Sequence, residues 1–340
     1  MRCFLARSEK LWVSFNPYTY ARVAVMKSRL LKKEDYHKLL KMGYHEIVRY
    51  LQEADYHQEI EKRLLQRRPN PTDIEIALNE NLLAMITKLY KISDEVLRKV
   101  IIAYMLRYEL RNIKAVVRSK IAKIPPHQAE ELFFPSFYHF RKEFLQELLQ
   151  KQELQEIVEK LPFLKKKQVK ENDLFALERL IDEYYIETIH EFASQLQGNG
   201  RQLAKFLQEE IENINIRTIL LLIKEHKQKI NENLVRPSHL IRSLAEKASL
   251  PEIVAILRKH HRTSLTGEEE NLAERIDIDL DVTLLSKEGR LLRENRLNAN
   301  YLIGYLLSKE IEVKNLIILL KGKLLQVTEA QVENLLVIPS

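Results

Sequence analysis

The chain is poor in the residues that usually interrupt helices or cross-link a fold. Among 340 residues there are seven glycines, ten prolines and one cysteine. A lone Cys3 excludes an internal disulfide framework and a cysteine metal cluster, and indicates a reducing compartment. The scarcity of glycine and proline disfavours strand-rich folds, which need many turns. With 45% hydrophobic and 30% charged residues, the sequence predicts an all-α protein. Its length allows one large domain or two to three small ones.

Long apolar runs are also missing. The most apolar stretches, Ile219 to Ile223 and Leu316 to Leu320, fall far short of the ~20 residues that span a bilayer. The N-terminal string MRCFLARSEKLWVSF has too short an apolar run for the core of a signal peptide. We therefore expect a soluble chain that is able to sit on a membrane, with residues 1–17 as a frayed N-terminal extension.

The net charge of +7 is a mild bias, because acids and bases alternate along most of the chain. The basic residues are densest in two clusters, which are Lys165, Lys166, Lys167 and Lys170, and Lys62, Arg63, Arg67 and Arg68. No nucleic-acid reading motif accompanies them, so we expect no nucleic-acid partner. Solvated loops are favoured over contacts with acidic lipid headgroups or an acidic partner.

Two short motifs recur three times in the same order. The first is Glu-Ile-Val, two residues, Leu, and it begins at Glu46, Glu156 and Glu252. The second is Glu, two residues, Asn and an aliphatic stripe. It reads ELRNIKAVVRSK from Glu109 with Asn112, ENINIRTILLLIK from Glu212 with Asn215, and EVKNLIILLKGK from Glu312 with Asn315. The distances from the first Glu to the Asn are 66, 59 and 63 residues. Three helical repeats are predicted, over residues 18–124, 125–231 and 232–340.

Local signals place helix ends inside these repeats. Thr72 and Glu75 have the spacing of a capping box, and Ser93 is expected to cap the next helix. The pair Pro125-Pro126 closes the first repeat, and the glycines of Gly198-Asn199-Gly200 break a helix in the second. Pro237 and Pro251 interrupt the start of the third.

The repeated asparagines are predicted to be structural. On a helix, Glu109 and Asn112 share a face with Ile113 and Val116, which places the amide at the edge of a buried stripe. A buried amide must be hydrogen-bonded, so we expect each Asn to bond a backbone group where the chain turns against a neighbouring helix. We favour this structural role of the asparagines over a catalytic one.

Signals for catalysis are weak. No glycine-rich loop precedes Lys-Ser or Lys-Thr, and there is no HExxH, so neither a nucleotide cofactor nor a metal is expected. His260 and His261 point to different helix faces. The aspartates of Asp277 to Asp281 lack the glycine and distal glutamate of a calcium loop, so an exposed polar edge is favoured over a divalent cation site. The aromatic string FFPSFYHF, residues 133–140, is interpreted as a packed plug between helices rather than a base-stacking surface.

Three segments carry a resemblance to a known family. They are YTYARVAVMKSRLLKKEDYHKLLKMGYHEIVRYL near the start, YELRNIKAVVRSK in the middle and YLLSKEIEVKNLIILLKGKLLQV near the end. Together they resemble the C subunit of the archaeal and bacterial V/A-type rotary ATPases, which is related to the d subunit of the eukaryotic V-ATPase. The resemblance extends over residues 18 to 336. It is most specific at the C-terminal end, at Glu310, Glu312, Asn315, Lys321, Gly322 and Lys323.

The resemblance implies a funnel of three similar helical lobes around a pseudo-threefold axis. It also implies a non-catalytic central-stalk subunit on the cytoplasmic face of the membrane. The wide end would rest on the proteolipid ring and the hollow would receive the tip of the D/F-type shaft, so that torque is coupled to H+ or Na+ transport. Neither a nucleotide cofactor nor a small-molecule substrate is implied.

One feature departs from the outer copies of the motif. The middle copy has Leu221 and Ile223 where they have Arg118 and Lys120, or Lys321 and Lys323, so we expect its outer face to be covered or differently used.

The sequence disfavours two other classes of protein. A helical-repeat scaffold that binds proteins or RNA would show a shorter period, of about 20 to 50 residues. An isoprenoid-type enzyme would need paired aspartate motifs on facing helices, whereas Asp277 to Asp281 has alternating spacing and no partner motif is visible.

Overall fold

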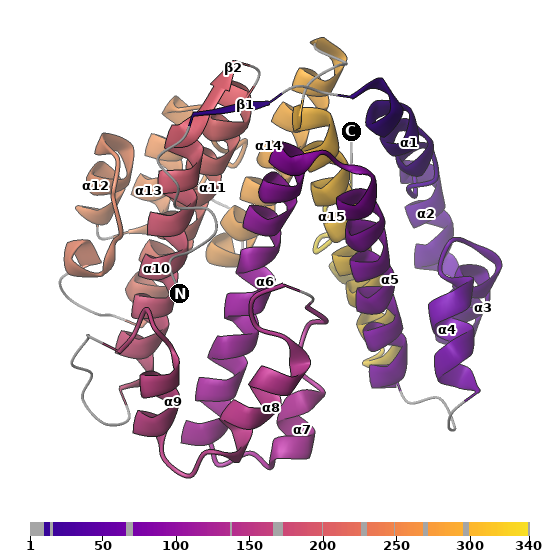
Figure 1. The fold of residues 1–340 in the computed structure, drawn as a ribbon. Helices are drawn as coiled ribbons and strands as arrows, with labels where there is room; N and C mark the ends of the chain where they lie inside the picture. The colour runs from indigo at the N-terminus through magenta and orange to yellow at the C-terminus, as the bar shows by residue number, and fades with distance from the viewer. Residues whose placement is uncertain are drawn as a thin grey trace. The chain divides into compact units, whose positions relative to one another are not determined.

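The fold is built almost entirely from helices (Figure 1). The computed structural model describes residues 10–13, 16–65, 71–136, 138–165, 173–198, 200–225, 230–247, 249–267, 271–294 and 299–338. Its longest helices are α5 (Pro71–Ile92), α6 (Glu95–Ile121), α10 (Leu174–Gln195), α11 (Gly200–Lys224), α14 (Leu272–Glu294) and α15 (Ala299–Leu324). The prediction of an all-α fold is confirmed.

Shorter helices separate the long ones. Before α5 they are α1 (Pro17–Ser28), α2 (Lys33–Lys41), α3 (Tyr44–Glu53) and α4 (His57–Leu64). Between α6 and α10 lie α7 (Pro126–Glu130), α8 (Lys142–Gln150) and α9 (Leu154–Lys160). A 3-10 helix η1 (Ile230–Asn233), α12 (His239–Ala245) and α13 (Leu250–Lys259) follow α11, and α16 (Glu329–Glu333) follows α15. Each motif-bearing long helix is thus preceded by another long helix and followed by a short one.

The chain forms two compact units, each made of two stretches of sequence. The first unit combines Tyr90–Leu207 with the N-terminal segment that contains strand β1 (Leu11–Val13). The second unit combines Ser14–Leu89 with Gln208–Ser340. These units are defined by contacts between residues, and the three predicted repeats remain a prediction about sequence similarity.

Residues 11–13 are not frayed. Strand β1 pairs in parallel with β2 (Leu196–Gly198), with Leu11 opposite Leu196. Leu11 and Val13 are buried, whereas Trp12 between them is exposed, which is the alternation of a half-buried strand. The expectation of a frayed extension is therefore wrong at this point. The side chains of Leu11, Trp12 and Val13 favour a strand, and the segment forms one because β2 offers a strand edge for pairing.

Two predicted caps are shifted by a residue or more. Helix α5 begins at Pro71, so Thr72 lies inside the helix, and Glu75 forms an ion pair with Lys321. Asp94, not Ser93, caps α6, because its carboxylate accepts a hydrogen bond from the N–H of Leu97. Pro126 begins α7, as expected for a residue that lacks the N–H.

Part of the second unit is organised around one apolar cluster. Buried residues of α11, α12, α13 and α14 form one cluster, which includes Ile216, Leu220, Ile241, Leu244, Ile253, Leu257, Ile276 and Leu280. Pro251 occupies the first turn of α13 without breaking it, because that turn needs no N–H donor there. The aliphatic stripe of the Asn215 motif is therefore one wall of this core.

Candidate functional site

The three motif asparagines make the same two-way contact. The Nδ2 of Asn112 donates to the carbonyl of Phe134 at 2.7 Å, and the N–H of Phe134 donates to Oδ1 at 2.8 Å. Asn215 bonds Val235 in the same way at 3.0 and 3.1 Å, and Asn315 bonds Val337 at 2.8 and 3.0 Å. All three side chains are buried. The expected backbone partner is present in every copy.

Each asparagine joins a long helix to the chain that follows the next short element. The partner residues Phe134, Val235 and Val337 come after α7, η1 and α16, at separations of 22, 20 and 22 residues from their asparagines. A backbone carbonyl and a backbone N–H on one residue fix both ends of the amide. We call these contacts the asparagine clamps, because each holds the segment after the turn against its long helix.

The motif glutamates are also buried or half-buried, yet their partners differ. Glu109 accepts hydrogen bonds from the N–H groups of Tyr138 and His139, and its Oε2 lies 3.1 Å from His139 Nδ1. Glu212 pairs with Arg262 at 3.1 Å. These partners come from different sequence contexts, and the motif spacing gave no signal for them.

Glu312 lies in a buried polar network of the second unit. Its carboxylate accepts from Lys309 at 2.8 Å, from the Tyr56 hydroxyl at 2.5 Å and from the N–H of Leu31 at 2.5 Å. The side chains of Lys309 and Glu312 are 5% and 3% exposed, so the ion pair is essentially dry. Burial, and then the charge of Glu312, raises the pKa of Tyr56 well above its ordinary value. The tyrosine hydroxyl therefore keeps its proton and serves as a donor.

The glutamates of the Glu-Ile-Val motif cap short helices. Glu46, Glu156 and Glu252 each occupy the third position of their helix, in α3, α9 and α13. Glu46 accepts from the N–H of Gly43 at 2.7 Å, and Glu156 from the N–H of Gln152 at 3.2 Å. Glu252 accepts from the Ser249 hydroxyl at 2.8 Å. A carboxylate at this position accepts hydrogen bonds at the start of the helix and interacts favourably with the positive end of the helix dipole. The isoleucine that follows the glutamate is buried in all three copies.

In the first unit, basic residues beyond Asn112 connect α6 to the neighbouring α10 (Figure 1). Lys114 lies 2.7 Å from both carboxylate oxygens of Asp182. One turn along, Arg118 makes a two-pronged contact with Glu178 at 2.5 and 2.8 Å. Burial raises the pKa of Asp182 above its ordinary value, and the charge of Lys114 offsets only part of that effect.

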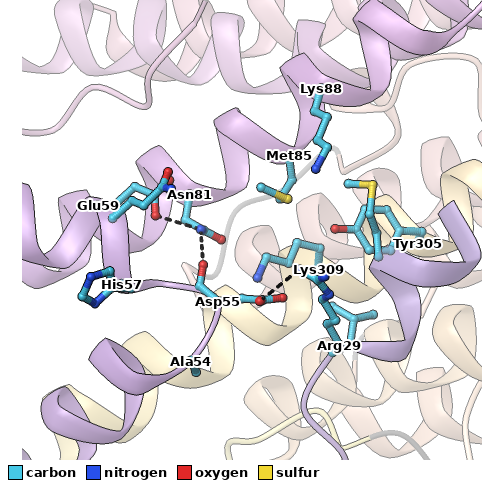
Figure 2. A pocket seen from close by; sticks show the side chains of 13 residues that line it. Arg29, Ala54, Asp55, His57, Glu59, Asn81, Met85, Lys88, Tyr305 and Lys309 are labelled. Atoms are coloured by element: carbon cyan, nitrogen blue, oxygen red, sulfur yellow. Dashed lines mark hydrogen bonds and ion pairs between the residues drawn. The ribbon is translucent and has the colours of Figure 1, made fainter. Parts of the chain in front are cut away.

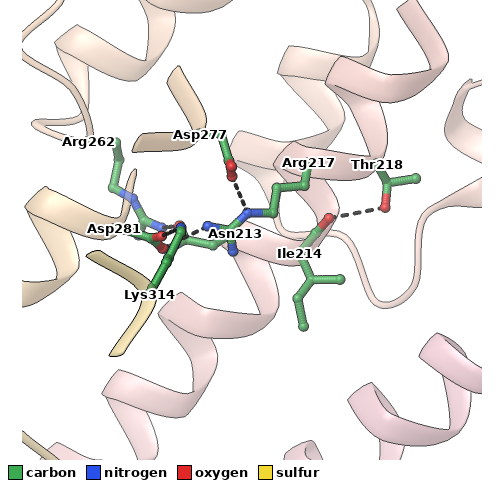
Figure 3. Close-up of polar contacts among 8 residues, drawn as sticks. All are labelled: Asn213, Ile214, Arg217, Thr218, Arg262, Asp277, Asp281 and Lys314. Atoms are coloured by element: carbon green, nitrogen blue, oxygen red, sulfur yellow. Dashed lines mark hydrogen bonds and ion pairs between the residues drawn. The ribbon is translucent and has the colours of Figure 1, made fainter. Parts of the chain in front are cut away.

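The second unit has a related set of ion pairs between α11, α14 and α15, shown in Figure 3. Arg217 contacts Asp277 at 2.5 Å and Asp281 at 2.7 Å, and Lys314 contacts Asp281 at 2.7 Å. Burial would raise the pKa of Asp281, but the charges of Arg217 and Lys314 outweigh it and hold this pKa below its usual value.

The aspartate string is therefore not an exposed polar edge. Asp279, on the other side of the helix, accepts from the backbone N–H of Ser264 at 2.9 Å and from the Thr263 hydroxyl. Alternating aspartates on α14 face two different neighbours because residues two apart on a helix point apart. The signal that sequence reasoning missed was the basic residue two positions after the motif asparagine, which is Lys114 in the first copy and Arg217 in the second.

The middle copy departs from the outer two as its sequence suggested, and its two substituted residues lie in different surroundings. Leu221 is 47% exposed, whereas Ile223 packs against the apolar core of the second unit. Arg118 and Lys321 of the outer copies pair with Glu178 and Glu75. In the middle copy, ion pairs are formed from other positions, such as Arg217 and Lys224.

The aromatic string after α7 is a packed plug, as predicted. Phe134 stacks on Tyr108 with ring centroids 4.1 Å apart, and Phe140 packs against Phe144 and Phe163. The same string supplies the backbone partners of Asn112 and Glu109. Phe137 of this string lies outside the described residues.

Two other candidates carry no site in the described part of the chain. His260 and His261 are both exposed, and the described residues include no group of three His, Cys, Asp or Glu side chains able to hold a metal ion. In the basic clusters, Lys166, Lys167, Lys170, Arg67 and Arg68 lie outside the described residues, while Arg63 pairs with Glu80. None of the described helices combines the length and apolar character that crossing a bilayer requires.

Comparison with known proteins identifies the family. The family model of the ATP synthase (C/AC39) subunit matches residues 19–335. The A-type ATP synthase C subunit of Methanosarcina acetivorans is 29% identical over 98% of this chain and 96% of its own length. The corresponding proteins of Archaeoglobus fulgidus and Methanocaldococcus jannaschii are 28% and 21% identical, over 94% and 96% of this chain and 96% and 88% of their own lengths.

The match therefore extends over both compact units and all three asparagine clamps, and it covers nearly the full length of these relatives. The chain belongs to the ATP synthase (C/AC39) subunit family.

Proposed function

We propose that this chain is the non-catalytic central-stalk subunit of a V/A-type rotary ATPase or ATP synthase. The observation that carries the proposal is the family match over residues 19–335, together with relatives named as the C subunit of A-type ATP synthases that align over nearly their whole length. In this role the chain is a socket between the rotating shaft of the soluble head and the membrane proteolipid ring. It passes torque that drives, or is driven by, H+ or Na+ transport.

The contacts within each unit support such a mechanical role. A coupling must resist deformation, and close-packed helices have low compressibility. The asparagine clamps add paired, buried hydrogen bonds at Asn112, Asn215 and Asn315, and ion pairs tie the motif-bearing helices to their neighbours. In the proposal, the three sequence repeats form three lobes of a funnel around a pseudo-threefold axis, at the cytoplasmic face of the membrane.

The proposed partners are the D/F-type shaft subunits and the proteolipid ring of the same complex. A socket that must release its shaft is expected to be polar, because interfaces between separable proteins are about as polar as the rest of the surface. Membrane contact in this proposal runs through the ring.

The proposal is tested by purifying the tagged full-length chain from detergent-solubilised membranes of its native host. Mass spectrometry should find a proteolipid and the shaft subunits among its partners. The purified assembly should hydrolyse ATP, whereas the isolated chain should not. Addition of excess untagged chain during assembly should reduce recovery of these partners, because both chains compete for one position.

Other outcomes would contradict the proposal. Recovery of the chain by itself, or with RNA or proteins unrelated to an ATPase, would return it to the class of helical scaffolds. ATP hydrolysis by the isolated chain would contradict its non-catalytic role.

A further inference from the structure

The second unit contains a polar cavity of about 340 Å³, shown in Figure 2. Its walls come from α1 and the residues after it, the α3–α4 junction, α4, α5 and α15. None of the motif residues discussed above lines it, and it lies outside the clamps and the ion pairs of α11 and α14. The volume is within the range of about 300–1,000 Å³ that is usual for small-molecule pockets.

One buried acceptor in this wall has no partner. Asn81 is 1% exposed, and its Nδ2 donates to the carbonyl of Asp55 at 3.0 Å and to Glu59 Oε2 at 2.9 Å. Because both neighbours are acceptors, the amide nitrogen must face them, and Oδ1 must face the other way. Oδ1 makes no hydrogen bond with any of the described residues. Leaving such an atom unsatisfied costs about 1–3 kcal/mol, so the position favours an external donor.

The cationic side chains of the cavity lie on one side of it, together with the carboxylate of Asp55. Figure 2 shows Glu59 and Asn81 on one side, with Lys88, Arg29 and Lys309 on the other. Lys88 is exposed and has no ion pair within the described residues, and Nη1 of Arg29 lies 3.5 Å from Oδ1 of Asp55. Lys309 donates to Tyr56 and Glu312, which leaves its third N–H for the cavity. One side can accept hydrogen bonds and the other can donate them.

We propose that this cavity binds a small zwitterion, with its ammonium group toward Asn81 Oδ1 and Glu59 and its acid group toward Arg29 and Lys88. A ligand with both ends satisfies the unpartnered amide oxygen and also occupies the cationic side. A simple anion leaves the amide oxygen unsatisfied, and a simple amine leaves the basic side unused. Met85 and Tyr305 supply the apolar wall for the atoms between the two ends.

The test uses the full-length chain and isothermal titration calorimetry with phosphoethanolamine and β-alanine, which carry both groups. Inorganic phosphate and ethanolamine serve as probes with one group each. At least one zwitterion should bind at least ten-fold more tightly than either single-ended probe. If no zwitterion binds at millimolar concentration, or if phosphate binds as tightly, the proposal is wrong. Vesicles of phosphatidylethanolamine distinguish a lipid headgroup from a free ligand, because only the former predicts cosedimentation that soluble phosphoethanolamine reverses.

Two variants test which side of the cavity faces each end of the ligand. Lys88→Gln should weaken zwitterion binding about five-fold by removing an exposed charge contact, and Lys91→Gln on the same helix should leave it unchanged. Glu59→Gln keeps an acceptor for Asn81 but removes the charge that faces the ammonium group. This variant should weaken zwitterion binding and leave any residual phosphate binding unaffected. Equal loss in Lys91→Gln, or none in either cavity variant, would contradict the assignment.

Discussion

Truncation of Asn315 to alanine tests what the asparagine clamps contribute. The substitution removes two hydrogen bonds, at 2.8 and 3.0 Å, and leaves both the N–H and the carbonyl of Val337 without a partner. Val337 and Asn315 are both fully buried, so water does not readily replace the amide. A typical intramolecular hydrogen bond contributes about 0.5–1.5 kcal/mol net, so two bonds predict a loss of about 1–3 kcal/mol.

The loss is measured as a shift of the urea midpoint of the full-length chain. With a slope of about 3 kcal/mol/M, a loss of about 2 kcal/mol moves the midpoint down by about 0.7 M. Amide hydrogen exchange gives a second readout, because the N–H of Val337 should lose protection when its acceptor is removed. This local loss separates the clamp from a general effect of shortening a side chain.

The matched control is Asn334→Ala, which makes the same chemical change at an exposed position three residues before Val337. A surface change of this kind is expected to stay within about 0.5 kcal/mol of the wild type. An unchanged midpoint in Asn315→Ala, or equal shifts in the two variants, would show that the clamp does not stabilise the fold.

Three further variants test other contacts. Gly322→Ala should destabilise the chain by about 1–3 kcal/mol although alanine favours helices, because a Cβ at Gly322 would lie 2.5 Å from Cγ2 of Val332. Thermal unfolding should show that the double variant with Val332→Ala recovers stability. Asp281→Asn should lose about 2 kcal/mol at pH 7. Because the folded pKa of Asp281 is lowered, this difference from the wild type should shrink as pH falls below about 4 and vanish only below the folded pKa. Asp182→Asn, whose wild-type pKa is raised, should stay within about 1 kcal/mol at pH 7, and equal losses in the two variants would contradict the charge argument. Lys309→Met should cost about 3–5 kcal/mol in urea unfolding, because it leaves a buried carboxylate without its counter-ion, and a stability equal to the wild type would refute that reading.

The asparagine clamps show what could be read from the residues. An amide that recurs on the edge of an apolar stripe must be buried and bonded, since an unpaired buried amide is costly. The sequence also contained a hint of the partners, because Glu-Asn-Leu precedes both Val235 and Val337 by a few residues. That hint is absent before Phe134, where the chain reads Glu-Glu-Leu-Phe. The sequence therefore revealed the repeated asparagine more readily than the residues to which it bonds.

The aspartates of α14 show where sequence reasoning failed. Asp277, Asp279 and Asp281 suggested an exposed edge because the string lacks the glycine and the distal glutamate of a calcium loop. Their partners Arg217 and Lys314 lie 60 and 33 residues away, and Thr263 lies 16 away. The pairing depends on which helices lie side by side, and helix periodicity carries no such information.

The sequence by itself determined the all-α class, the recurring motifs and the family, because these follow from composition, spacing and order along the chain. Tertiary structure decided which groups meet. It pairs β1 with β2, places Glu312 between Tyr56 and Lys309, and leaves the buried Oδ1 of Asn81 without a hydrogen-bond partner among the described residues. The physical reason is that burial and electrostatic pairing act through space. The free energy of a side chain is set by neighbours that the chain brings together only when it folds.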